Sequence, residues 1–209
     1  MALFQTDKIL LAFILLLFLS ASADDKLDEI YNSVIEKYSS ISTFEADFTQ
    51  ENYWKDLDVE KISSGKVYYN RNCFLLSYSD PAGQTLLLED NILKIVDIES
   101  NQMLITDNIT HELRPDKIIS SYWQNSQVDL KNRAEDLIEL SFITQPGDSI
   151  FVVLNDFLIR EFCFVDDQGN SVKYSFSNSV VNPDLSDSVF ELDLPQDIDI
   201  IDNRSSSEN

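Results

Sequence analysis

Apolar residues recur at every third or fourth position over residues 24–41, which is the spacing of one face of a helix. A second, shorter helix is predicted over about residues 115–123, because Pro115 suits the first turn of a helix and later apolar residues share one face. No other segment predicts a helix in the folded domain. The apolar stripe of the first helix consists of Leu27, Ile30, Tyr31, Val34, Ile35 and Tyr38.

Short runs rich in Val, Ile, Phe and Tyr occupy most of the remaining chain, and clusters of Asp, Asn, Pro and Gly separate them. Such runs are typical of strands, and the clusters are typical of tight turns. Successive short strands joined by tight turns form an antiparallel meander rather than a parallel sheet. The predicted strands cover residues 43–54, 61–70, 73–79, 84–89, 92–97, 101–106, 137–143, 149–154, 157–165, 171–177 and 189–193.

This order of elements predicts a mainly β fold with helices (α+β). Large sheets curl or close, so we expect an incomplete antiparallel β-barrel of about 11 strands covered by an α-helical lid. The lid and the sheet could enclose an apolar cavity that holds a ligand, or they could pack together as a solid core. The composition alone does not distinguish these two alternatives.

The first residues have the pattern of a cleavable signal peptide. Residues 9–19 are all apolar, Lys8 precedes them, and Ala21-Ser22-Ala23 forms a small-x-small cleavage site. A bilayer span needs about 20 apolar residues, whereas a signal peptide needs only about 7 to 15. An uncleaved membrane anchor is the alternative. We therefore expect an exported monomer with a signal peptide over residues 1–23, one domain over residues 24–203 and a polar tail over residues 204–209.

The sequence is strongly acidic, with 37 acidic and 15 basic residues and a formal net charge of −22. A surface of this charge repels nucleic-acid phosphates and anionic lipid headgroups, so we expect no nucleic-acid partner and no electrostatic binding to membranes. The chain is nevertheless 44% hydrophobic, which is too apolar for a disordered acidic chain. The acidic residues are therefore expected to coat a folded core.

Few residues are available for catalysis or for metal binding. The single histidine, His111, lies in a polar segment, and no serine is flanked by the glycines of a nucleophile elbow. A zinc site needs more Cys and His residues than the sequence has, and its glycines form no phosphate-binding loop. We therefore expect a protein that is not an enzyme and has no cofactor and no metal. A hydrolase that uses a pair of carboxylates stays open, because acidic residues are numerous.

The two cysteines, Cys73 and Cys163, each lie in an apolar run that is predicted as a strand. In an oxidising compartment they could form one disulfide. Two buried free thiols are the alternative.

A series of short motifs follows the first predicted helix. The segment Phe44-Glu45-Ala46-Asp47-Phe48-Thr49-Gln50 has the form F-x-A-x-F-x-Q, and the run Phe190-x-Leu192-x-Leu194-Pro195 stands before Asp199-Ile200-Ile201. Between them lie Gly65, Arg71, Phe74 to Tyr78, Pro81, Gln84, Gln102 and the turn Asp167-Gln168-Gly169-Asn170. In this order the motifs resemble those of the outer-membrane lipoprotein carrier family, LolA. The resemblance covers nearly the whole chain after the predicted signal peptide.

The resemblance implies an open β-barrel with a helical lid that acts in the periplasm. Its cargo would be triacylated lipoproteins, whose acyl chains it shields in an apolar cavity. Its partners would be an inner-membrane lipoprotein-releasing ABC transporter and an outer-membrane lipoprotein receptor. Two other functions stay open: a periplasmic binder of another apolar cargo, such as a glycolipid or a fatty acid, and a structural envelope protein without a cavity.

The resemblance also implies site residues. Arg71 would lock the lid, because in the family the guanidinium at this position donates hydrogen bonds to backbone carbonyls of the lid; an ordinary exposed arginine at a strand end is the alternative. The acyl-chain cavity would be lined by residues whose alternative role is core packing. These lining residues are Phe44, Phe48, Phe74, Leu76 and Tyr78.

Overall fold

The structure is a computed structural model that describes residues 25–107, 115–134, 136–145 and 147–204. The predicted signal peptide, His111 and all but the first residue of the predicted tail lie outside the described residues. Two α-helices are described, one over residues 25–39 and the other, α2, over Pro115–Asn125. Short 3₁₀ helices cover Lys55–Leu57 (η1) and Asp187–Phe190 (η3). Within the described ranges, no helix has the length and the apolar character to cross a membrane.

Twelve strands in the described part of the chain form one sheet, in the order β12-β6-β5-β4-β3-β2-β1-β11-β10-β9-β8-β7. All neighbouring pairs are antiparallel except β12 and β6, which are parallel. The strands are β1 (Thr43–Trp54), β2 (Val59–Asn70), β3 (Cys73–Asp80), β4 (Ala82–Glu89), β5 (Ile92–Asp97), β6 (Gln102–Thr106), β7 (Ser126–Ala134), β8 (Leu137–Thr144), β9 (Ser149–Asn155), β10 (Leu158–Val165), β11 (Ser171–Val181) and β12 (Asp199–Asp202).

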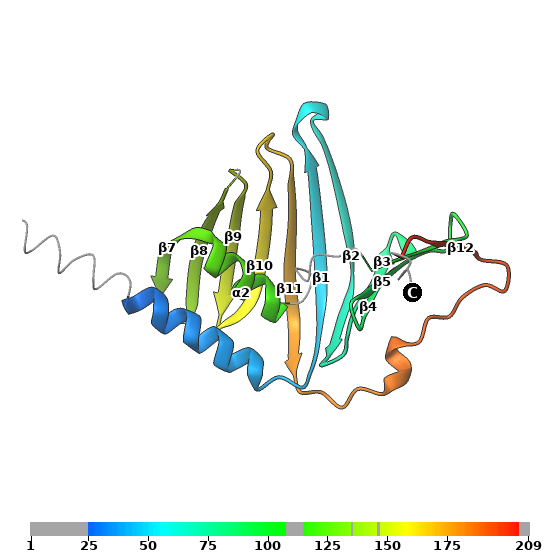
Figure 1. The fold of residues 1–209 in the computed structure, drawn as a ribbon, viewed down its shortest axis with the longest axis horizontal. Coiled ribbons are helices and arrows are strands. Elements are labelled where there is room, and N and C mark those ends of the chain that lie inside the picture. The colour runs from blue at the N-terminus through cyan, green and yellow to red at the C-terminus, as the bar shows by residue number, and fades with distance from the viewer. Residues whose placement is uncertain (1–24, 108–114, 135, 146, 205–209) are drawn as a thin grey trace, which may run out of the picture.

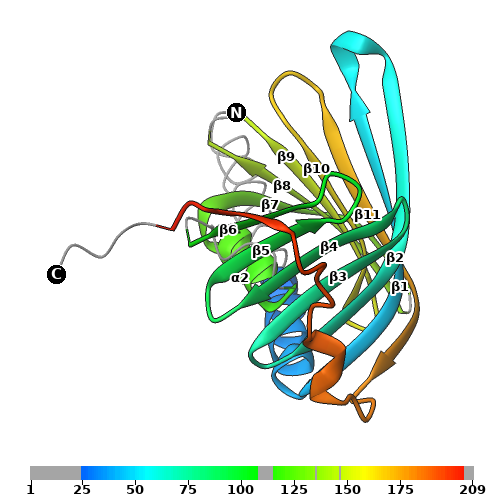
Figure 2. The same cartoon turned by 90° about the vertical axis from the view of Figure 1, so that its right-hand side faces the viewer.

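The sheet curls but does not close, because its two edge strands, β7 and β12, do not pair with each other. Both helices lie on the concave side, over β7 to β10, while β3 to β6 form the opposite wall (Figure 1, Figure 2). This arrangement confirms the predicted fold class, an open, mainly antiparallel sheet covered in part by helices.

The helices are held on the sheet by a large apolar core. Ile30 and Val34 of the first helix and Ile119 of α2 are at most 1% exposed. They pack against alternate residues of β8 and β9 that all point to the concave side, as period-two alternation requires. The buried members of this core are Ile30, Val34, Ile119, Ile138, Leu140, Phe142, Ile150, Val152, Leu154 and Ile159.

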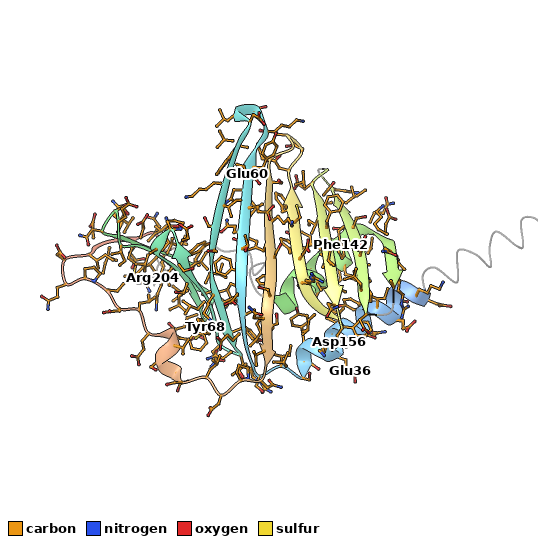
Figure 3. The ribbon with its side chains drawn as sticks, turned by 180° about the vertical axis from the view of Figure 1, so that it is seen from behind. Glu36, Glu60, Tyr68, Phe142, Asp156 and Arg204 are labelled. Atoms are coloured by element: carbon orange, nitrogen blue, oxygen red, sulfur yellow. The ribbon has the colours of Figure 1, made fainter. Side chains whose placement is uncertain are left out.

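The predicted strand over residues 189–193 is wrong. Residues 189 and 190 are the end of η3, whose N-cap Ser186 accepts a hydrogen bond from the Ser188 amide, and residues 191–193 follow it without pairing with a strand. Phe190 and Leu192 both pack against the convex face, near Tyr68 (Figure 3). The partners of this segment on the sheet are Tyr68, Cys73, Leu75 and Leu87.

Two further strands are absent from the prediction. Ser126–Ala134 (β7) is an edge strand whose inward side chains Val128 and Leu130 are followed by polar residues, so its apolar alternation is short. Asp199–Asp202 (β12) is a four-residue strand that pairs in parallel with β6, a partner distant in sequence. The sheet therefore has twelve strands rather than about eleven.

Cys73 and Cys163 are free thiols in the structure. Burial raises the pKa of the Cys73 thiol, and the nearby carboxylate of Glu89 raises it further. Burial also raises the pKa of the Cys163 thiol. Of the two alternatives, the structure has the free thiols; Cys73 is buried and Cys163 is partly buried, and the raised pKa of each favours its neutral form.

Candidate functional site

The residues predicted to line an acyl-chain cavity all belong to one apolar cluster. Phe48, Phe74 and Leu76 are buried, with 2%, 5% and 3% of their surfaces exposed. Phe44 and Tyr78 are partly buried and pack against the same cluster. We refer to this set as the concave cluster; it consists of Ala46, Phe48, Val67, Phe74, Leu76, Leu88 and Leu93, flanked by Phe44, Tyr69, Tyr78, Leu86, Tyr174 and Phe176.

Strand register explains why these residues meet. Alternate residues of β1 and β3 point to the same face of the sheet, and β2 lies between the two strands with matching alternate positions. Three rows of side chains therefore cross the strands side by side. The rows are Phe44–Tyr69–Phe74, Ala46–Val67–Leu76 and Phe48–Gly65–Tyr78.

Gly65 gives the third row its close packing. The rings of Phe48 and Tyr78 meet edge to face, with centroids 5.0 Å apart and an interplanar angle of 85°. A Cβ at position 65 would lie 2.9 Å from Phe48 Cε1 and 2.1 Å from the Ser77 carbonyl oxygen. Only glycine therefore fits between the two aromatic residues at this point.

The apolar surface continues from the concave cluster toward the open edge at β12. The row that contains Leu76 passes through Leu86 on β4, Ile95 on β5, Leu104 on β6 and Ile201 on β12. Ile95 is 38% exposed and Ile201 is 41% exposed. We call Leu86, Ile95, Leu104 and Ile201 the open-edge row. It extends the buried apolar face into surface that a ligand can reach.

A polar network borders the concave cluster on the side of the long β1–β2 hairpin. Tyr78 Oη donates a hydrogen bond to Gln50 Oε1 at 2.6 Å. Gln50 Nε2 in turn donates to Asn52 Oδ1 at 3.0 Å. Burial, together with the neighbouring Tyr78 hydroxyl, raises the pKa of Tyr174, and burial raises the pKa of Tyr78. The network therefore joins neutral side chains of β1, β3 and β11.

Sequence reasoning missed this network as a site. Gln50 stands in a recognised motif that gives it no role, and Tyr174 is only part of a predicted strand. The two residues are opposite each other in the β1–β11 register, although they are far apart in the sequence. The sequence signal that could have placed Tyr174 is the apolar character of alternate residues 172, 174 and 176. This pattern indicates that Tyr174 faces inward, but it does not indicate which strand pairs with its own.

Arg71 lies in the short turn between β2 and β3, at the end of the concave cluster that carries Phe74. Its side chain is exposed. No described residue accepts a hydrogen bond from its guanidinium. The lid-locking role of Arg71 stays a prediction.

The concave cluster contains no carboxylate among its described members. Nor do the described residues contain a group of three or more His, Cys, Asp or Glu side chains that could hold a metal ion. What this site offers to a ligand is an apolar surface with amide and hydroxyl groups at one side. Such a surface can bind a hydrocarbon chain.

A separate groove of about 270 Å³ lies between β3 to β5 and residues 189–194. Its walls include Leu75 and Thr85, which point to the convex face, and the acidic Glu191 and Asp193. Carboxylates beside the groove make it a poorer surface for acyl chains than the concave cluster.

Comparisons with known proteins agree with this fold. Residues 39–193 match the model of a protein family described as outer membrane lipoprotein carrier protein LolA. No curated protein sequence matches the chain.

Solved structures are similar to this chain to different degrees, all at low sequence identity. An uncharacterized conserved protein from Thermus thermophilus has a TM-score of 0.54 and 14% identity, covering 85% of this chain and 99% of that chain. A chain of the MucA/MucB complex from Pseudomonas aeruginosa has a TM-score of 0.51 and 12% identity, covering 82% of this chain and 61% of that chain. A putative outer membrane lipoprotein-sorting protein domain from Vibrio parahaemolyticus has a TM-score of 0.46 and 9% identity, covering 78% of this chain and 94% of that chain.

Proposed function

The chain belongs to the outer membrane lipoprotein carrier family, LolA, and from this premise we propose that it is a periplasmic carrier of acylated lipoproteins. It shields the acyl chains of its cargo on the concave face and moves them from an inner-membrane release complex to an outer-membrane receptor. It acts by binding and release rather than by catalysis. The family match supports the carrier role, whereas the two membrane partners and the periplasmic location are part of the proposal.

One observation carries the proposal: the apolar concave cluster continues without interruption into the exposed open-edge row. Leu76 is 3% exposed, whereas Ile95 and Ile201, in the same row, are 38% and 41% exposed. Exposed apolar side chains that continue a buried apolar face are typical of a binding surface. An acyl chain can therefore contact the open-edge row first and then extend toward the cluster.

The energetics of acyl burial favour partial shielding. Each buried CH₂ group contributes about 0.8 kcal/mol, so three chains of about 16 carbons would contribute about 35 kcal/mol if fully buried. Non-covalent affinities do not exceed about 20 kcal/mol. A carrier must also release its cargo. Since the sheet is open at β12, part of each chain can stay outside the protein, which keeps the affinity low enough for transfer.

We further propose that Arg71 controls release through the lid. Its turn joins β2 to β3, next to the part of the concave cluster formed by Tyr69 and Phe74. Arginine offers several donors in a planar fork, which suits hydrogen bonds to backbone carbonyls of a lid when the lid is closed. Cargo that displaces the lid would break these bonds, and their re-formation would favour release.

A binder of another apolar cargo is the second candidate, because the same surface could hold a glycolipid or a fatty acid. A carboxylate-based hydrolase is less consistent with the site, since the described members of the concave cluster are all apolar or aromatic.

The test is to purify the protein from the envelope of its own host and to identify the bound molecules by native mass spectrometry and lipid analysis. We expect acylated lipoproteins. Their transfer to acceptor outer-membrane vesicles should then be measured in a purified system, with bovine serum albumin as a non-specific carrier control. Recovery of only free lipids would support the second candidate instead. Absence of any acylated ligand under conditions that saturate the system would contradict both.

A further inference from the structure

We propose that Gln50, Asn52 and Lys61 form a polar rim that binds the ester carbonyl groups at the glyceryl end of an acylated ligand. This inference rests on the proposed carrier function and goes further by fixing the direction in which the acyl chains lie. The glyceryl end would sit at the rim, and the chains would run along the concave cluster toward β12.

The side-chain amide of Asn52 has two N–H groups that can donate hydrogen bonds to a ligand beside the concave cluster. Its Oδ1 accepts the hydrogen bond from Gln50 Nε2 at 3.0 Å, which orients the amide so that Nδ2 points away from Gln50. No described residue accepts a hydrogen bond from Asn52 Nδ2, and this nitrogen is not among the buried unsatisfied atoms. The two N–H groups are thus accessible and fixed in direction, because the Tyr78–Gln50–Asn52 chain holds the amide.

Lys61 supplies a cation on the same face. It is directly opposite Asn52 in the β1–β2 register, so both side chains project to the concave side. Lys61 is exposed, and no carboxylate of the described residues lies within 4.0 Å of its ammonium group. The ammonium group adds a second type of donor, beside the amide N–H groups, to the rim.

The polar rim and the apolar surface follow one another along the inward face of β1. Phe48, Gln50 and Asn52 are successive inward positions on β1, and alternate residues of a strand are about 7 Å apart. The distance from the Phe48 ring to the Asn52 amide is therefore on the order of two such steps. Ester carbonyls lie directly at the start of the hydrocarbon in an acylated glycerol. The order of donors followed by apolar residues matches that arrangement.

The Tyr78–Gln50–Asn52 chain is satisfied internally by its own hydrogen bonds, so it does not need a ligand to fold. Only the outermost donors, on Asn52 and Lys61, lack partners among the described residues. A ligand without carbonyl groups would still bind the concave cluster but would leave these donors to water. The rim should therefore act on selectivity more than on total affinity.

The experiment compares two uncharged probes, 1,2-dioctanoylglycerol and its 1,2-di-O-octyl ether analogue, by isothermal titration with the intact protein. The ether lacks the two carbonyl oxygens and is slightly more apolar, so hydrophobic binding alone would favour the ether. We expect the ester to bind about three- to ten-fold more tightly, the effect of one or two hydrogen bonds. Asn52→Leu should reduce this ratio to one or below and leave the ether affinity within about two-fold.

Asn132→Leu, an exposed asparagine on β7, is the matched control and should keep the wild-type ratio. Lys61→Met is a second rim variant and should lower the ratio in the same direction, which protects the test if Asn52→Leu folds poorly. Equal binding of ester and ether by the wild-type protein would overturn the rim while leaving the carrier function intact. Failure of both probes to bind would instead contradict the proposed function.

Discussion

Phe48 and Tyr78 pack edge to face across the strand that separates them, with ring centroids 5.0 Å apart, and Gly65 is the residue of that strand that lies between them. The contact joins β1 to β3 directly over β2. Tyr78 also connects this contact to the polar network, because its hydroxyl donates a hydrogen bond to the side-chain amide of Gln50. One glycine therefore supports both the apolar cluster and the polar network beside it.

Gly65→Ala should destabilise the protein strongly. The added Cβ would lie 2.1 Å from the backbone oxygen of Ser77, and a backbone atom cannot move without disturbing the β2–β3 pairing. Overpacking of this kind costs about 3 kcal/mol of unfolding free energy. Urea denaturation measures it. Ser63→Ala, at the next inward position of β2, is the control and should cost less than about 1 kcal/mol. Equal effects of the two variants would show that the glycine is not required by packing.

Ile95→Asp and Ile201→Asp should each weaken acyl-chain binding by at least about ten-fold, because a carboxylate in the open-edge row must lose water when hydrocarbon covers it. Stability should change little, since both side chains are more than a third exposed. Displacement of a fluorescent fatty acid measures the affinity. Ile143→Asp is matched in type and exposure, at 44%, but its side chain points to the convex face of β8. Similar losses from all three variants would contradict a role for the open-edge row.

Arg71→Leu should leave loading of lipoprotein intact and slow its release to the receptor. The physical reason is that the variant loses the donors that are proposed to re-form bonds with the lid when cargo leaves. Loading and transfer are measured separately in a purified reconstitution. Arg160→Leu, an exposed arginine on β10, should transfer at the wild-type rate. Transfer at the wild-type rate by Arg71→Leu would contradict the proposed lid-locking role of Arg71.

The family motifs indicated Phe44 and Phe48 on β1 and Phe74, Leu76 and Tyr78 on β3, and the structure places all five in one cluster because alternate residues of a strand share a face. Their role as the lining of an acyl-chain cavity stays a prediction. The partner strand of β1 on its other side could not be predicted. The β1–β11 pairing joins residues distant in the sequence and contains a bulge between Glu45 and Asp47, so Tyr174 could not be placed beside Gln50 from the sequence.

The alternation of apolar and polar residues was misleading where apolar side chains pack against the sheet but their backbone pairs with no strand. Phe190 and Leu192 have the spacing of a strand, yet Phe190 ends η3 and Leu192 follows it, and both cover the convex face without pairing with a strand. In β7, the reverse occurs: residues Asp129, Lys131 and Arg133 make the edge polar, so the sequence has little strand character and the pairing with β8 decides the structure. Charged edge strands of this type also protect the open sheet from pairing with other chains.

Stability should fall at high pH because of Tyr174 and Tyr78. Burial raises the pKa of both hydroxyls above the usual value of 10.0, so their contribution is fully present below about pH 10 and is lost as the pH rises through the higher folded values. The urea midpoint, measured between about pH 7 and pH 11, should be flat and then decrease. Tyr174→Phe should reduce the alkaline decrease, since this side chain no longer ionises on unfolding. An unchanged pH profile in Tyr174→Phe would contradict this assignment.

Binding of acyl chains should change the fluorescence of Trp123 if the helices move as a lid. The Trp123 ring on α2 lies 5.1 Å from that of Tyr31 on the first helix and 5.6 Å from that of Phe142 on β8, so it reports on both contacts of the lid. The chain has two tryptophans, and Trp54→Phe leaves Trp123 as the single reporter. Saturation of this variant with a fatty acid should shift the emission to longer wavelength, because opening exposes the ring to water. Trp54, at the end of β1 and 40% exposed, is the remaining tryptophan in Trp123→Phe, and a change in its emission would report on the rim end of β1 and not on the lid. Unchanged Trp123 emission at saturation would mean that acyl chains bind without displacing α2.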